Sequence, residues 1–343
     1  MLFRKSENQQ AYLKAGILGF AGSGKTYTST KLAIGLVGHM RAHNLEMGNR
    51  PAFFLDTETG SDWVNPEFQA AGIEMHVAKT RAFQDLLAAV KEAESSASIL
   101  QIDSISHFWR EICDSYMKKR NRTRLEFQDW NYLKTEWGKF TDLFVNSNLH
   151  IIMCGRAGYE YDYFEDDSGK KQLEKTGIKM RAETETGYEP SLLFLMERHM
   201  NMENKTVWRE AHVLKDRARL LDGQTFKNPE FKHFLPHIEF LNLGGTQVGV
   251  DVTRNSEGMI DPDGKHEWAK ERERRDILVE KIGATFTKAG LSAQSAAGKK
   301  RIVELLERHF GTTAWKELET MKADRLQSGM DMLISDLSDT VSA

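Results

Sequence analysis

The amino-acid sequence predicts an α/β fold, in which a mostly parallel sheet is flanked by helices, followed by a small all-α domain. Three observations support this prediction. Short apolar segments alternate with segments of helical spacing as far as residue 154. A glycine-rich loop joins the first apolar segment to the first helical one. From residue 264 onward, apolar residues recur at helical spacing only.

The first part of the chain has the order expected of successive βαβ units. Residues 12–18 form an apolar run that ends in glycine, and residues 29–37 then have helical spacing. Because strands and helices alternate, the strands are expected to lie parallel. The other elements expected here are a strand at 51–55, a helix at 82–93, a strand at 97–102, a long helix containing Trp130 and Phe144, and a strand at 149–154.

After this series the pattern changes to one typical of hairpins. Residues 159–165 and 171–180 flank a turn-rich segment at 166–169, which predicts a protruding hairpin. Two further strands are expected at 192–196 and 206–214. These elements complete the predicted core.

The domain boundaries are predicted from composition. The segment around residues 246–263 is rich in Gly, Asp, Asn and Ser, which favours a linker. We therefore predict a P-loop domain over residues 1–245, and a helical module over residues 264–343 that is large enough to bury its own core.

The composition is that of an ordinary globular protein, with 40% hydrophobic and 28% charged residues. The 47 basic and 50 acidic residues nearly balance, so any contact with nucleic acid must come from a local patch. Cys113 and Cys154 lie in apolar or helical segments and are expected to be buried free thiols. Without a long apolar run, we expect no membrane association and a cytoplasmic location.

The glycine-rich loop has the pattern of a P-loop and follows a strand and precedes a helix. In such a loop, backbone N–H groups and the helix N-terminus bind phosphates. Lys25 would reach the β- and γ-phosphates, and the Thr26 hydroxyl would bind Mg²⁺. The sequence thus predicts ATP and Mg²⁺ as cofactors. The residues predicted to contact the nucleotide are Gly19, Ala21, Gly22, Ser23, Gly24, Lys25, Thr26 and Tyr27.

Two acidic residues at strand ends are candidates for the chemistry. Asp103 ends a buried strand and is the predicted second ligand of Mg²⁺, although an Asp there could also cap the next helix. Glu58, just past the strand at 51–55, could activate the attacking water, with Asp56 as its competitor.

These motifs carry a resemblance to a known family. Residues 54–58 (Phe-Leu-Asp-Thr-Glu) and 102–104 (Ile-Asp-Ser), at their distances behind the P-loop, resemble the RecA-type ATPase core. Residues 177–183, 187–193 and 196–198 are similar to segments of phage-encoded RecA-like ATPases of the AAA type, linked to recombination and single-strand annealing. The resemblance covers roughly residues 10–240.

The resemblance implies roles for further residues. It assigns the catalytic glutamate to Glu58 and adds a basic residue from a neighbouring subunit, with Lys215 and Arg217 as candidates. It therefore implies self-association into a ring or filament. The chain departs from RecA because Gly155 and Arg156 stand where RecA has a glutamine. Arg156 could sense the γ-phosphate, or face DNA, or be structural.

One local patch could bind nucleic acid. Five basic residues lie in a run of seven, with aromatic residues nearby, although such a run is often only a solvated helix face. In the predicted hairpin, the first arm is acidic and only the second arm has charges suited to DNA. The basic residues of the patch are Lys118, Lys119, Arg120, Arg122 and Arg124.

We therefore expect an ATPase that acts on single-stranded DNA in phage recombination, annealing or replication, inside the bacterial cytoplasm of the host. Lys25, Glu58 and Arg156 are its expected catalytic residues. The helical module is expected to bind a partner protein or DNA, or to aid assembly. Two other classes stay open: a nucleotide-switched interaction protein, such as a helicase loader or an antagonist of host defence, and a P-loop kinase of nucleotides or small molecules.

Overall fold

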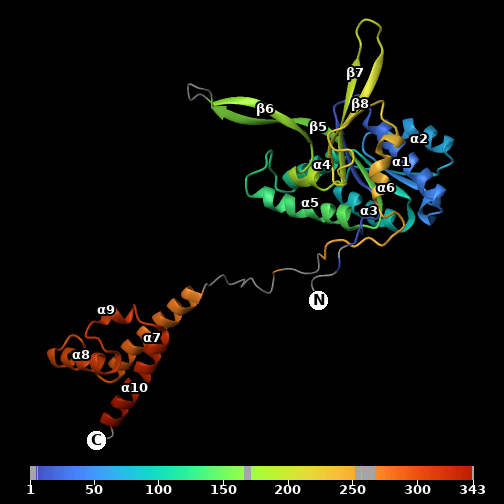
Figure 1. The fold of residues 1–343 in the computed structure, drawn as a ribbon. Coiled ribbons are helices and arrows are strands. Elements are labelled where there is room, and N and C mark those ends of the chain that lie inside the picture. Colours follow the sequence, from blue (N-terminus) through green and yellow to red (C-terminus); the bar gives the residue numbers. More distant parts are fainter. Residues whose placement is uncertain (1–4, 6, 166–170, 252–255, 257–266, 342–343) are drawn as a thin grey trace. The chain divides into compact units, whose positions relative to one another are not determined.

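The fold was analysed in a computed structural model, which describes residues 5, 7–165, 171–251, 256 and 267–341 (Figure 1). The chain divides into two compact units, residues 1–250 and 251–343. The turn expected at 166–169, together with Lys170, lies outside the described residues, as does most of the linker expected at 246–263.

The first unit is built on a nine-stranded sheet with the order β3-β2-β4-β5-β1-β7-β8-β9, and β6 pairs with β5. The strands from β3 to β7 in this order are parallel, whereas β6, β8 and β9 are antiparallel to their neighbours. The mostly parallel sheet confirms the predicted fold class. The strands are β1 Lys14–Gly19, β2 Ala52–Asp56, β3 Met75–Lys79, β4 Ile99–Asp103, β5 His150–Glu165, β6 Lys171–Met180, β7 Leu192–Met200, β8 Val207–Asp216 and β9 Thr225–Lys227.

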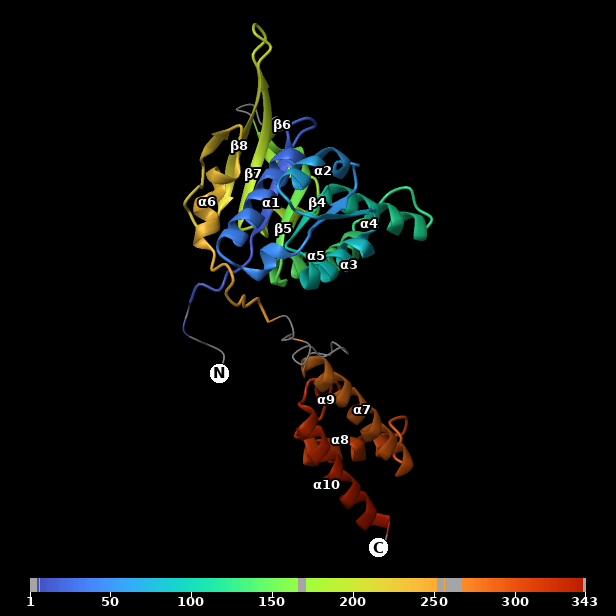
Figure 2. The ribbon, with the colours of Figure 1, turned by 90° about the vertical axis from the view of Figure 1, so that its right-hand side faces the viewer.

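Helices cover both faces of this sheet (Figure 2). On α5, Leu133, Trp137 and Phe140 recur at helical spacing and are buried against the sheet, as the pattern of a core-facing helix requires. The helices packed on one face are α1 Lys25–Ala42, α2 Ser61–Ala70 and α6 Phe231–Phe240. Those on the other face are α3 Phe83–Ser96, α4 Ile105–Lys119 and α5 Asp129–Asn146.

Three features of the sheet differ from the sequence prediction. β5 runs without a break from His150 to Glu165, so the expected strand at 149–154 and the first hairpin arm are one strand. β3 and α2 were not predicted. β3 is the edge strand of the sheet and is largely exposed, so it lacks the apolar alternation of a half-buried strand.

Two hairpins, β5–β6 and β7–β8, project from the sheet in different directions (Figures 1 and 2). β5 and β7 flank β1 as parallel neighbours before they leave the sheet. The carboxyl ends of parallel strands meet at one edge, so both hairpins begin beside the loop that follows β1. Two short 3-10 helices, Glu46–Asn49 and Thr184–Tyr188, complete this unit.

The second unit is all-helical and has its own core of buried apolar side chains, including Ile282, Leu305 and Leu326. Ser295 caps one of its helices by accepting a hydrogen bond from the Gly298 N–H at 3.0 Å. Its helices are α7 Glu267–Lys288, α8 Ala296–Phe310, α9 Trp315–Leu318 and α10 Ala323–Val341. Among all the helices that the structure describes, none is both long and apolar enough to cross a membrane.

Candidate nucleotide site

The loop between β1 and α1 has the conformation that its glycines allow. Gly22 and Gly24 have φ angles of 73° and 95°, in the left-handed region where side chains are strained. Both lie under the β7–β8 hairpin: a Cβ atom at Gly24 would come within 2.8 Å of Arg209 Cδ, and one at Gly22 within 3.9 Å of Arg198 Cδ. The loop therefore needs glycine for its backbone angles, and at Gly24 for space as well.

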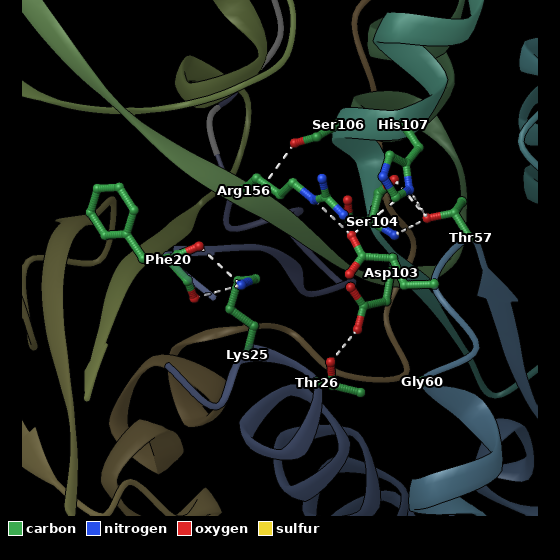
Figure 3. Close-up of polar contacts among 12 residues, drawn as sticks. Phe20, Lys25, Thr26, Thr57, Gly60, Asp103, Ser104, Ser106, His107 and Arg156 are labelled. Carbon is green, nitrogen blue, oxygen red and sulfur yellow. Dashed lines mark hydrogen bonds and ion pairs between the residues drawn. The ribbon is translucent and has the colours of Figure 1, made fainter. Parts of the chain in front are cut away.

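Lys25 is the first residue of α1 and folds back over the loop (Figure 3). Its ammonium group donates hydrogen bonds to the backbone carbonyls of Gly19 at 2.9 Å and Phe20 at 3.1 Å. An anion at the N-terminus of α1 would compete for these protons, because hydrogen bonds between charged groups are the stronger ones. The geometry therefore suits a phosphate group.

Thr26, in the first turn of α1, contacts Asp103, the last residue of β4. The Thr26 hydroxyl donates to Asp103 Oδ2 at 2.5 Å (Figure 3). Burial raises the pKa of Asp103 to about 6, and only 2% of this residue is exposed. A hydroxyl beside a buried carboxylate fits Mg²⁺, which prefers oxygen ligands and would offset the cost of the buried charge. These two residues are the ones that would hold the ion.

Asp56 and Glu58 have different environments at the end of β2. Asp56 is buried and accepts hydrogen bonds from the backbone N–H groups of Glu58, Gly60 and Ser61, and from the Ser61 hydroxyl at 2.5 Å. Although burial opposes it, these bonds hold the pKa of Asp56 below its ordinary value. Asp56 therefore shapes the loop, and Glu58 is the acid left to act on a substrate.

Glu58 faces Arg156 from the neighbouring part of the sheet. Arg156 Nε donates to Glu58 Oε1 at 2.9 Å, and the Arg156 backbone N–H is held by the Ser106 hydroxyl at 2.9 Å. Partial burial would raise the pKa of Glu58, but the hydrogen bond and charge of Arg156 lower it. Glu58 is thus ionised near neutral pH, as a group that orients or deprotonates water must be.

His107 and Thr57 also belong to this site, although neither was predicted to. The Thr57 hydroxyl lies 2.7 Å from His107 Nδ1 and accepts the backbone N–H of Ser104 at 2.7 Å. His107 Nδ1 is 3.8 Å from Glu58 Oε1. Burial, reinforced by the charge of Arg156, lowers the pKa of His107. Its position four residues after Asp103 was the one available signal.

A cavity of about 650 Å³ opens beside the start of α1. Tyr27 is half exposed in its wall, and the Lys31 ammonium lies 5.1 Å above the Tyr27 ring. The volume suits a small organic ligand, so this cavity is the best candidate for the nucleoside part of a nucleotide. Arg209 and the segment after β9 were not predicted to line it. Its lining residues are Gly24, Tyr27, Thr28, Lys31, Arg209, Asn228, Pro229 and Glu230.

Lys215 and Arg217 lie at the other end of the sheet from the P-loop of their own chain. Lys215 pairs with Leu193 at the start of β7, whereas Gly19 pairs with Met196 further along that strand. Both basic side chains donate to the Tyr188 carbonyl, Arg217 at 3.0 Å. Burial and the charge of Arg217 lower the pKa of Lys215. A role for them at a neighbouring subunit's site stays a prediction.

The basic patch occupies the end of α4 and the turn that follows it. Arg122 forms ion pairs with Asp129 at 3.0 Å and Glu126 at 3.1 Å, so its charge is largely compensated. Arg120 lies over the Tyr116 ring at 5.5 Å. The other members of the patch, Lys118, Lys119 and Arg124, are exposed, and so is the neighbouring Phe127.

The sheet, the P-loop and the acidic residues at strand ends define a P-loop nucleotide-binding protein. The model of the AAA domain family matches residues 11–217, more than half of the 343-residue chain, and the chain belongs to this family. Proteins of this family generally hydrolyse nucleotides, and the match therefore places the chain in the general class of nucleotide-binding ATPases. No curated protein matches the sequence.

Proposed function

We propose that the chain hydrolyses ATP with Mg²⁺ and that binding of single-stranded DNA stimulates this reaction. The observation that carries the proposal is the continuity of β5. The middle of this strand contributes Arg156 to the nucleotide site, and its continuation carries a row of exposed tyrosines. The same strand would thus carry both the residues that contact DNA and a residue of the hydrolytic site.

The hydrolytic roles follow from the contacts in the site. Lys25 would transfer its hydrogen bonds from the loop carbonyls to phosphate oxygens. Thr26 and Asp103 would hold Mg²⁺, which neutralises charge on the phosphates when bound. Glu58 would align the attacking water and accept its proton. Arg156, already bonded to Glu58, would keep that carboxylate in place or turn to a phosphate oxygen.

On the β5–β6 hairpin the tyrosines of β5 lie on one face, and Glu160, Asp162 and Phe164 lie on the other. Tyr159 and Tyr161 lie on one face, with ring centroids 6.4 Å apart, and the Lys175 ammonium lies 3.6 Å from the Tyr159 ring. Glu160 and Asp162 alternate with them and so lie on the other face. The acidic arm expected to repel DNA therefore leaves an aromatic face suited to stacking with bases.

A direct contact connects this aromatic face to the P-loop. The Phe20 ring, in the loop, lies 5.0 Å from the Tyr159 ring. A base stacked on the tyrosines would restrict Tyr159, and Tyr159 contacts the loop residue whose carbonyl accepts from Lys25. This chain of contacts supports stimulation of hydrolysis by DNA.

The biological setting of the proposal rests on the RecA resemblance. That resemblance supports a role in phage recombination, annealing or replication, and assembly into a ring or filament. The helical module, which folds around its own core, would then contact a partner protein or DNA. In an assembly, Lys215 and Arg217 would have to release the Tyr188 carbonyl to reach a neighbouring site.

The proposal is tested by measuring phosphate release with and without single-stranded DNA, and DNA binding by fluorescence anisotropy in a salt titration with ATP and Mg²⁺. We expect stimulation by DNA and an affinity that falls as salt rises. Tyr159→Ala should keep basal hydrolysis and lose most of the stimulation. Lys25→Ala, the control, should lose both.

Each other outcome counts against part of the proposal. Hydrolysis without any binding of single-stranded DNA would refute the DNA role and favour a nucleotide-switched interaction protein. Phosphate transfer to a nucleoside or nucleotide from a panel would instead favour a kinase. Binding of ATP without hydrolysis under any condition would refute the enzymatic role.

A further inference from the structure

The β7–β8 hairpin carries a second group of polar side chains that the nucleotide site does not use. Because side chains alternate along a strand, Glu197 and His199 of β7 share one face with Trp208, Glu210 and His212 of β8. Glu197 pairs directly with Glu210, and His199 pairs with Trp208. The opposite face carries Arg198 and Arg209, which lie over the P-loop glycines.

One ligand atom each from Glu197, His199 and His212 lies within 4.8 Å of the other two, and Glu210 lies beside both histidines. His212 Nε2 lies 3.2 Å from Glu197 Oε2, and His199 Nε2 lies 3.3 Å from Glu210 Oε2. The other two nitrogen to oxygen distances are 3.6 and 3.8 Å. In a tetrahedral site with metal-ligand bonds of about 2.1 Å, neighbouring ligand atoms are about 3.4 Å apart. The distances from Glu197 Oε2 to the two histidine nitrogens, 3.2 and 3.6 Å, are therefore close to the spacing of ligands around one such ion.

The contacts of the ring nitrogens are compatible with metal ligands. His212 Nδ1 lies 2.9 Å from the Thr225 hydroxyl, a partner that can hold the ring proton on Nδ1 and leave a lone pair on Nε2. Both Nε2 atoms are shielded from solvent, and within the described residues neither makes a hydrogen bond. Shielded polar atoms without a hydrogen bond are uncommon and point to a missing ligand.

Further contacts orient the side chains of Glu210 and His199. The Trp208 indole N–H donates to Glu210 Oε1 at 2.8 Å, which leaves Oε2 turned to the histidines. The His199 ring stacks on Trp208, with centroids 5.4 Å apart and planes 17° apart. Supporting contacts of this kind fix ligand orientation in protein metal sites.

We propose that Glu197, His199 and His212 form a binding site for a divalent transition metal of the zinc class, with Glu210 as a neighbouring carboxylate that faces both histidines. Two imidazoles favour such an ion over Mg²⁺ or Ca²⁺, which prefer oxygen ligands. The site is separate from Thr26 and Asp103. It would hold the two strands together at the level where Arg198 and Arg209 face the P-loop, and it is independent of the proposed DNA-stimulated hydrolysis.

The test uses the full chain without a histidine tag, freed of metal by a chelator and titrated with Zn²⁺ against a chromogenic chelator. We expect one Zn²⁺ bound per chain, and its loss in the double variant His199→Gln/His212→Gln. His76→Gln is the matched control, because His76 contacts a single glutamate, Glu74, at 2.8 Å and should not change the stoichiometry. The buried thiols Cys113 and Cys154 are not expected to compete.

A second variant covers the risk that the double variant fails to fold. Thr225→Val removes the partner of His212 Nδ1 without touching a ligand, and it should weaken Zn²⁺ binding about 10- to 100-fold. With Co²⁺ as a probe, the native chain should develop the visible absorption typical of tetrahedral coordination. Absence of Zn²⁺ binding by the native chain, or equal binding by native and double variant, would overturn the proposal.

Discussion

The two hairpins that leave the sheet beside the P-loop have the same architecture and opposite chemistry. On β5–β6 the notable side chains, Tyr159 and Tyr161, are exposed and face solvent. On β7–β8, Arg198 and Arg209 face inward to the P-loop glycines, and the other face holds a compact group of His and Glu side chains. One hairpin is suited to contact a long ligand, and the other to enclose a small one.

The nucleotide site is connected to both hairpins through their bases. β5 brings Arg156 to Glu58 at 2.9 Å. The first residues of β7 pair with β1, and the rest of β7 continues into the hairpin. Side chains near the base of a strand are held by the sheet, whereas those further out are held only by their partner strand. The hairpins can therefore respond to ligands, while the residues at their bases stay in register with the P-loop.

The largest effect on the rate of hydrolysis is expected at Glu58, which follows β2 and accepts a hydrogen bond from Arg156 of β5. Glu58→Gln keeps the size of the side chain and its bond to Arg156, but it cannot accept a proton. Loss of a general base typically costs 10²- to 10⁴-fold in rate, so kcat should fall about that much. Affinity for a fluorescent ATP analogue should stay within about twofold. An unchanged kcat would remove Glu58 from the reaction.

The next largest effect would distinguish the roles of the two hairpins in nucleotide binding. Arg209→Ala removes a guanidinium whose stem lies over Gly24, and a charge-assisted hydrogen bond to a phosphate is worth about 1.5–3 kcal/mol. Nucleotide affinity should therefore fall about 10- to 100-fold, measured by titration calorimetry. Lys179→Ala on β5–β6, where Lys179 pairs with Glu160 at 3.2 Å, is the control and should leave nucleotide affinity unchanged. Equal losses in both variants would contradict the division of roles.

The parts of this site that the sequence predicts are those encoded by contiguous residues. The P-loop, Asp103 and Glu58 follow strands that have clear apolar runs, and parallel strands bring their ends together at one edge. The fold class followed from the same alternation. β3 was missed because an exposed edge strand carries no strong periodic signal, and α2 was missed because Pro66 lies inside it, a residue that disfavours a helix.

Residues joined by antiparallel register were not predictable in this way. Arg209 and His212 come from a strand whose pairing with β7 shifts register between Leu193 and Phe194. A shift of one residue moves every side chain to the other face, so the inward arginines and the outward histidines depend on that irregularity. The opposite faces of β5–β6 could likewise not be assigned from the acidic and basic totals of its arms.

A stability measurement tests the buried carboxylate of Asp103 at the end of β4. Burial raises the pKa of Asp103 from 3.8 to about 6, so the folded chain retains a proton there that the unfolded chain has lost. Stability should therefore fall as the pH rises through this window, and the loss is complete by pH 7. Without Mg²⁺ at pH 7.5, Asp103→Asn should raise the free energy of unfolding by about 1–3 kcal/mol, measured in urea.

The neighbouring Asp56 provides the matched control for this stability effect. It pairs with Asp103 in register, but its hydrogen bonds lower its pKa despite burial. Its ionised form is therefore favoured in the folded chain, and this contribution is lost only as the pH falls through its depressed pKa. Asp56→Asn should destabilise the chain at pH 7.5, with the opposite sign. The same sign for both variants would refute the assignment of distinct roles.

The smallest effect is expected on the outward face of β5–β6 and would sharpen the contrast between its two faces. A stacked base contributes about 1–3 kcal/mol, and a ring of the row shares that contact with its neighbours, so Tyr161→Ala should weaken single-stranded DNA binding about five- to tenfold. Tyr161→Phe keeps the ring and should bind nearly as the native chain does.

Asp162→Ala, one residue further on the opposite face, removes only a distant repulsion and should tighten binding less than twofold, with an effect that disappears as salt rises. Tyr161 and Asp162 are adjacent in sequence and lie on opposite faces of β5. A larger effect at Asp162 than at Tyr161 would therefore mean that DNA contacts the acidic face, and the assignment of the DNA-contacting face would be wrong.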